Sequence, residues 1–145
     1  MTSDADPQPA TAPQPEAPAA ENLTPSGEIV IRTIAMPADA NANGDIFGGW
    51  IVSQMDMGGG ILARATSHSR VTTVAIDSMA FIRPVNVGDI VTCYGRLLSV
   101  GRTSMKVDVE VWVQRSSDEA LLRVTEGKFT YVAIDRTGKP RPVKR

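Results

Sequence analysis

The chain has 145 residues, of which 42% are hydrophobic and 21% are charged, an ordinary balance for one globular domain. Its formal net charge of −1 excludes a general attraction to DNA or RNA, so an anionic ligand must be held by local groups. One cysteine, Cys93, and one histidine, His68, can form neither an intramolecular disulfide nor a zinc site. We therefore expect no metal and a reducing, cytoplasmic compartment.

The first 26 residues are rich in proline and alanine and contain no lysine or arginine. This composition lacks the basic start and apolar run of a signal peptide and cannot bury enough apolar surface to fold. It predicts a disordered leader over residues 1–26 and a folded domain over residues 27–145. No segment reaches the roughly 20 apolar residues of a membrane helix.

Residues 28–35 are rich in β-branched side chains and predict a first strand. Residues 37–49 follow with proline, asparagine, aspartate and glycine at turn-forming density, which indicates a long irregular loop. Residues 50–66 predict a helix that is apolar on most of its circumference and should be buried. Its three glycines, residues 58–60, each cost about 1 kcal/mol relative to alanine, a cost that close packing could offset.

Four further strands are predicted at residues 71–82, 90–100, 103–115 and 120–133, separated by turn signals. Residues 103–115 alternate clearly, so we expect an apolar face from Met105 to Val113 and a solvent face with Asp108 and Glu110. Strands joined by short turns should be antiparallel neighbours. The fold class is therefore α+β: one helix wrapped by a curved antiparallel sheet of about five strands. Residues 71–82 are apolar on both faces, which favours a covering second subunit.

Two aspartates stand out as candidates for chemistry. Asp45 lies in the glycine-rich loop before the helix, and Asp56 lies inside the apolar helix, on the same face as Gly59 and Ala63. The alternative for Asp45 is a loop residue that bonds its own backbone. The alternative for Asp56 is a buried acid paired with backbone amides or an arginine.

The loop delivers Asp45 to a helix start, where the free N–H groups of Gly49 and Trp50 carry partial positive charge. An oxyanion held there, with a carboxylate that activates water or itself attacks the carbonyl, suits acyl transfer. The residues leave base and nucleophile open. A serine hydrolase is disfavoured, because no G-x-S-x-G elbow occurs and His68 lies in a polar turn that we interpret as solvated. Cys93 is interpreted as a small apolar residue within a strand.

The chain resembles the hotdog-fold acyl-CoA thioesterases, most closely the small bacterial YciA-like group, over residues 27–145. The resemblance is carried by Met36-Pro37-Ala38-Asp39, Asn41-Ala42-Asn43-Gly44-Asp45-Ile46-Phe47-Gly48-Gly49-Trp50, Gln54-Met55-Asp56, Asp77-Ser78-Met79 and Val87-Gly88-Asp89. It implies a central helix wrapped by a sheet, subunits paired edge to edge, and dimers assembled into a homohexamer. It also implies a composite site between subunits, with Asp45 from the loop and Asp56 from the helix of the facing domain.

The resemblance further implies thioester binding by Asn43, Gly48, Gly49 and Trp50. Contacts to the coenzyme A phosphates are expected from basic and hydroxyl groups near subunit edges. The candidates are Arg83, Arg102, Thr103, Ser104, Lys139 and Arg141. Arg83 could instead cap a strand end, and the basic tail could be a solvated, frayed terminus.

The predicted function is hydrolysis of acyl-CoA to a free acid and coenzyme A, with no cofactor beyond the coenzyme A of the substrate. Such a reaction belongs to fatty acid metabolism, and the expected partners are the acyl-CoA and other copies of the chain. One alternative is a hydratase or dehydratase of the same fold, which would rely on a histidine placed near the helix start. Another is a non-catalytic acyl-CoA-binding sensor, which would not need both acids.

Overall fold

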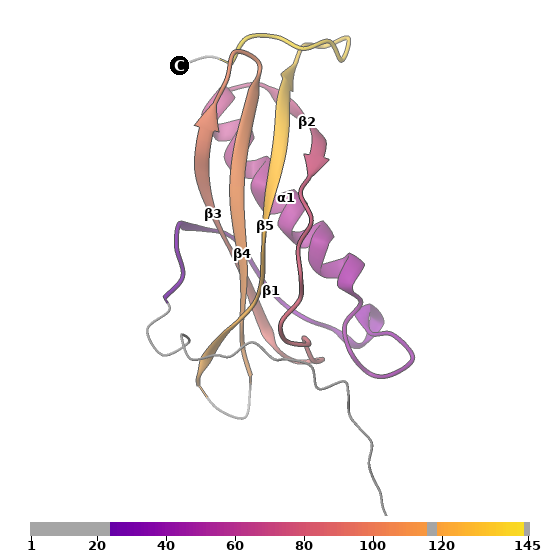
Figure 1. Cartoon of the computed structure of the whole chain (residues 1–145). Helices are drawn as coiled ribbons and strands as arrows, with labels where there is room; N and C mark the ends of the chain where they lie inside the picture. Colours follow the sequence, from indigo (N-terminus) through magenta and orange to yellow (C-terminus); the bar gives the residue numbers. More distant parts are fainter. Residues whose placement is uncertain (1–23, 116–118, 144–145) are drawn as a thin grey trace, which may run out of the picture.

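The computed structural model describes residues 24–115 and 119–143. In chain order its elements are β1 (Glu28–Ile34), a short 3-10 turn η3 (Pro37–Asp39), α1 (Gly48–Ser67), β2 (Arg70–Ile76), β3 (Ile90–Val100), β4 (Ser104–Gln114) and β5 (Leu121–Ile134). The strands form one antiparallel sheet in the order β1-β3-β4-β5-β2, and α1 lies along one face of it (Figure 1). The predicted α+β fold, one helix against a curled sheet, is confirmed.

Helix α1 begins two residues earlier than predicted, after Phe47, and ends at His68. His68 adopts a left-handed conformation with φ of 55°, and its N–H donates to the carbonyl of Arg64, a common way to end a helix. The buried side of α1 carries Ile51, Met55 and Ala63. The prediction of a fully buried helix is wrong for the isolated chain, because Met57 and Ile61 on the other side are each about half exposed, at 51% and 52%.

The glycines of α1 mark close contacts with the sheet. A Cβ at Gly58 would come within 2.7 Å of the Val30 side chain on β1, and one at Gly59 within 3.1 Å of the Tyr131 ring on β5. At Gly60 the nearest atom would be 3.7 Å away, an ordinary contact. Close packing against the sheet therefore explains two of the three glycines, as expected, and the third is not required by space.

Strand β2 is shorter than predicted and has a different neighbour. It ends at Ile76 rather than residue 82, and it pairs with β5 at the sheet edge rather than with β3. The connection over residues 77–89 is long, so it does not force β2 and β3 to be neighbours. Its first part still follows β5, because Asp77 N–H donates to Lys128 O and Ile82 N–H donates to Val124 O.

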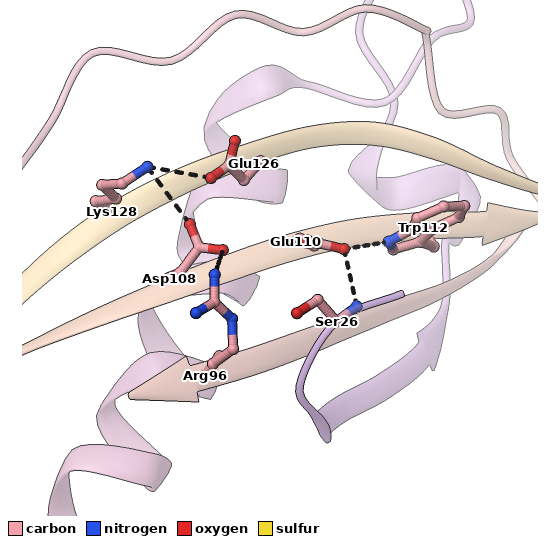
Figure 2. A network of polar contacts seen from close by, with 7 residues as sticks. All are labelled: Ser26, Arg96, Asp108, Glu110, Trp112, Glu126 and Lys128. Atoms are coloured by element: carbon pink, nitrogen blue, oxygen red, sulfur yellow. Dashed lines mark hydrogen bonds and ion pairs between the residues drawn. The ribbon is translucent and has the colours of Figure 1, made fainter. Parts of the chain in front are cut away.

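The outer face of β4, away from α1, is buried rather than wet. Asp108, Glu110 and Trp112 are only 2%, 8% and 3% exposed. Figure 2 shows the cause: Arg96 of β3 and Lys128 of β5 lie over Asp108, at 3.6 and 3.8 Å, and Trp112 Nε1 donates to Glu110. The inner face is apolar and buried as predicted, at Met105, Val107, Val109, Val111 and Val113.

The predicted leader lies mostly outside the described residues, which begin at residue 24. Within it, Ser26 is placed over the outer face of the sheet, where its N–H donates to Glu110 Oε1 at 3.2 Å (Figure 2). Across the described ranges, no helix combines the length and the apolar character needed to cross a membrane.

Candidate functional site

The loop before α1 is built around Asn41. Its side-chain oxygen accepts the N–H groups of Asn43, at 2.8 Å, and of Asp45, at 3.2 Å, and its own N–H donates to Asp45 O at 2.7 Å. Gly44 completes the turn with a φ of 91°, which favours glycine. The backbone of Asp45 is thus fixed while its side chain is exposed. Within residues 24–115 and 119–143, no donor is hydrogen-bonded to the Asp45 carboxylate, so the backbone-bonding alternative does not apply.

Asp45 lines a hollow of about 270 Å³. Its other walls include Arg83, Phe81 and Gly48 at the start of α1. Arg83 Nη1 donates to the carbonyl of Arg123 at 2.8 Å, so its guanidinium is held against β5. Asp45, the basic residue Arg83 and apolar residues therefore line one space, which is large enough for a small part of a ligand.

The start of α1 opens beside this hollow. Among the described residues no side chain caps it, and a Cβ at Gly49 would meet nothing within 4 Å. The amides of Gly48 and Gly49 precede the first intrahelical bonds and are available to an anion. The amide of Trp50 is not free as predicted, because it donates to Phe47 O at 3.1 Å. The backbone amide of Asn43 is likewise used inside the loop.

Asp56 lies further along α1, half-buried, and its partners are hydroxyl groups. Its Oδ1 accepts Thr73 Oγ1 of β2 at 2.7 Å and Tyr131 Oη of β5 at 3.1 Å. The predicted alternative, pairing with amides or an arginine, is not what the structure has. Burial, and then the charge of Asp56, raise the pKa of Tyr131, so the phenol stays protonated and acts as the donor.

Apart from Arg83, the nucleotide-binding candidates gather at the opposite end of the molecule. The β3–β4 turn with Arg102, Thr103 and Ser104 lies beside the chain end, whereas the Asp45 loop lies at the other end of α1 (Figure 1). The tail is tied back as far as residue 143, where the described residues end: Val143 N–H donates to Arg102 O, and Arg141 N–H donates to Ala133 O. One chain therefore brings Asp45 and Arg83 together, but separates them from Arg102, Lys139 and Arg141.

The remaining reactive side chains are remote from the hollow. His68 is exposed at the far end of α1, as its interpretation as a solvated residue predicts, so it is not placed as a hydratase histidine would be. Cys93 is fully buried on β3, and burial raises the pKa of its thiol to about 12, which suits an inert structural residue. In the described part of the chain, no group of three or more metal-binding side chains comes together.

Comparisons with known proteins agree with this architecture. Residues 43–120 match the Thioesterase superfamily. The chain is 55% identical, over 83% of its length and 92% of the relative, to the acyl-CoA thioester hydrolase YciA of Salmonella typhimurium. A hexameric broad-specificity acyl-coenzyme A thioesterase superposes with a TM-score of 0.83 at 52% identity, over 86% of each chain. A hexameric hotdog-fold thioesterase of Campylobacter jejuni gives 0.77 at 45% identity, over 81% of this chain and 91% of that one.

The family match covers more than half of the chain, and the relatives align with more than four fifths of it. One helix packed against a curled five-stranded antiparallel sheet matches the fold of these hotdog-type thioesterase structures. The chain therefore belongs to the thioesterase superfamily, and its fold is the hotdog fold.

Proposed function

We propose that this protein hydrolyses acyl-coenzyme A thioesters, with coenzyme A present only as part of the substrate and product. The observation that carries the proposal is the Asp45 carboxylate, without a hydrogen-bond partner among the described residues, on a hollow that Arg83 also lines and that borders the open start of α1. An acid, a cation and free helix-start amides are the groups that thioester hydrolysis requires. The relatives named acyl-CoA thioester hydrolases support the same activity.

In the proposed reaction the thioester carbonyl oxygen points at the amides of Gly48 and Gly49, with Asn43 and Trp50 beside them. Asp45 takes a proton from water as the water oxygen bonds to the carbonyl carbon. The carbon–sulfur bond then breaks, the sulfur leaves with the electron pair and takes up a proton, and a free acid and coenzyme A result. In the variant with Asp45 as nucleophile, its carboxylate attacks the carbonyl carbon, the thiolate of coenzyme A leaves, and water then attacks the Asp45 carbon of the mixed anhydride, which releases the acid with an Asp45 oxygen.

The active unit in this proposal is an oligomer. The loop that carries Asp45 and the β3–β4 turn that carries Arg102 lie at opposite ends of one chain (Figure 1), so we infer that a substrate that spans both meets groups from two copies. In one copy, the phosphates or adenine would be held by Arg102, Thr103, Ser104, Lys139 and Arg141. Asp56 of a facing helix would be the second acid. Relatives described as hexameric support a hexamer of paired hotdog subunits.

A lone cysteine without a disulfide partner supports a cytoplasmic location, and the products suit a role in fatty acid metabolism. Both extend the central proposal and depend on it.

The test measures thiol release from acyl-CoAs of increasing chain length by the wild type, Asp45→Asn and Glu119→Gln. We expect Asp45→Asn to lose at least about 100-fold in kcat, the usual range for a general base, and Glu119→Gln to match the wild type. Undiminished turnover by Asp45→Asn would show that the assigned mechanism is wrong. Binding without turnover, measured by calorimetry on the wild type, would favour the acyl-CoA sensor.

A single turnover in water enriched in oxygen-18 separates the two mechanisms. If Asp45 is a base, the product acid carries oxygen-18 from the first turnover. Unlabelled product acid in the first turnover would instead indicate that an Asp45 oxygen had been transferred.

A further inference from the structure

Two hydroxyl groups from different strands meet the same carboxylate oxygen on α1. Thr73 Oγ1, on the edge strand β2, and Tyr131 Oη, on β5, both donate to Asp56 Oδ1, at 2.7 and 3.1 Å. Tyr131 Oη also donates to the Asp56 carbonyl oxygen, at 2.9 Å, so its one proton is shared between the two acceptors. Within the described ranges no group is hydrogen-bonded to Oδ2. One oxygen of Asp56 is therefore held and the other remains free for a further partner.

The fold makes specific room for this contact. Tyr131 is 1% exposed and stacks on Phe129, with ring centroids 6.4 Å apart and ring planes at 12°. Its hydroxyl reaches Asp56 only because residue 59 is glycine, since a Cβ there would collide with the phenol. The tyrosine is thus rigid, whereas an aspartate on an isolated helix would sample several rotamers.

The hydroxyl of Tyr131 is a donor at every working pH, because burial and the charge of Asp56 disfavour its ionised form. The Thr73 hydroxyl likewise stabilises the carboxylate only as a hydrogen-bond donor. Both contacts hence favour one orientation of the charged side chain.

We propose that Thr73 and Tyr131 are positioning residues, which hold Asp56 Oδ1 so that Oδ2 faces the thioester or its attacking water. This inference rests on the proposed function, in which Asp56 is the second acid of the site. It assigns the two hydroxyls to the chemical step rather than to substrate binding, because neither lines the hollow at Asp45 nor lies in the Arg102 turn.

The variants are Thr73→Val, Thr73→Ser, Tyr131→Phe and Asp56→Asn, with Tyr131→Phe also made in the Asp56→Asn background. Thr73→Val and Tyr131→Phe remove one hydroxyl each and keep the shape of the side chain. We expect kcat to fall roughly 10- to 100-fold in each, as for a lost hydrogen bond to a charged group, while KM changes less than about twofold. Thr73→Ser should restore most of the activity, and Tyr131→Phe should add nothing once Asp56 is asparagine.

The melting temperature and molar mass of each variant show that it folds and assembles. If Asp56→Asn is impaired but Thr73→Val and Tyr131→Phe keep wild-type kcat, the inference fails and the proposed function stands. An equal further loss from Tyr131→Phe in the Asp56→Asn background also overturns it, because the tyrosine then acts independently. If Asp56→Asn is fully active, Asp56 has no role in the reaction and this inference fails with it. Whether the protein is a thioesterase is decided separately, by the thiol-release assay of the wild type and Asp45→Asn.

Discussion

Asp108 is an acid in an unusual position, at the centre of the sheet's outer face. Burial first, and then the neighbouring Glu126, raise its pKa to about 7, while Lys128 and Arg96 act in the opposite direction. The Glu126 pKa is lowered, chiefly by its hydrogen bond to Asp108. Asp108 therefore keeps its proton to a higher pH than Glu126 does, and Lys128 contacts Glu126 at 3.2 Å (Figure 2).

This proton predicts a pH-dependent stability. Between the ordinary aspartate pKa of about 4 and pH 7, the folded chain keeps a proton that the unfolded chain has lost. The contribution of Asp108 to stability is therefore fully present below about pH 4, falls as the pH rises, and is lost above about pH 7. For one proton, the free energy of unfolding cannot change by more than about 1.4 kcal/mol per pH unit. Melting temperatures from pH 5 to 8 should show a smaller slope in Asp108→Asn than in the wild type.

The matched control for this prediction is Glu28→Gln, which changes an exposed acid on β1. Its melting temperature should follow the wild type across the same range. A slope that persists unchanged in Asp108→Asn would show that another group holds the proton.

Single residues differed in how far the sequence could predict them. Asp45 could be singled out because its loop has a turn composition and leads into a helix, which are both local features. The partners of Asp56 could not, because Thr73 and Tyr131 lie on strands whose order depends on the whole sheet. The burial of Asp108 was missed for the same reason: alternation along β4 tells which face it is on, but not that Arg96 and Lys128 cover that face.

At the scale of elements, α1 and the β3–β4–β5 meander could be predicted well, because local periodicity and short turns determine them. The place of β2 could not, since residues 77–89 are long enough to reach more than one neighbour. The glycines of α1 indicated close packing but not its partner, which is Val30 at Gly58 and Tyr131 at Gly59.

Two adjacent glycines in α1 therefore predict opposite effects of the same substitution. Gly59→Ala places a Cβ against the buried Tyr131 and should destabilise the protein by about 1 to 3 kcal/mol, despite the better helix propensity of alanine. Gly60→Ala meets only an ordinary contact at 3.7 Å and should gain up to about 1 kcal/mol. Melting temperatures at equal protein concentration test the pair, and the expectation fails if Gly59→Ala is the more stable variant.

At the scale of the whole molecule, the β2 edge is a surface that needs a partner. In the described part of the chain β2 pairs only with β5 and leaves its other edge open, and apolar side chains on β2 and on the segment that follows it stay exposed: Val74 54%, Ile76 45% and Phe81 43%. An open, apolar edge strand is a site for pairing with another chain. The covering subunit predicted for residues 71–82 would fit here, and it would bring the Asp45 end of one copy toward groups of another.

A charged side chain on this edge should dissociate the subunits, and activity should be lost with the dissociation. We expect Val74→Glu to lower the molar mass measured by light scattering, because burying an unpaired carboxylate in the interface is costly. Val87→Glu makes the same change at a similarly exposed valine, 41%, away from the strand, and should keep the wild-type mass. Thioesterase activity should fall with the mass of Val74→Glu, since one chain leaves Asp45 far from Arg102. A Val74→Glu protein of unchanged mass would place the interface elsewhere, and a dissociated but fully active one would mean that a single chain holds the whole site.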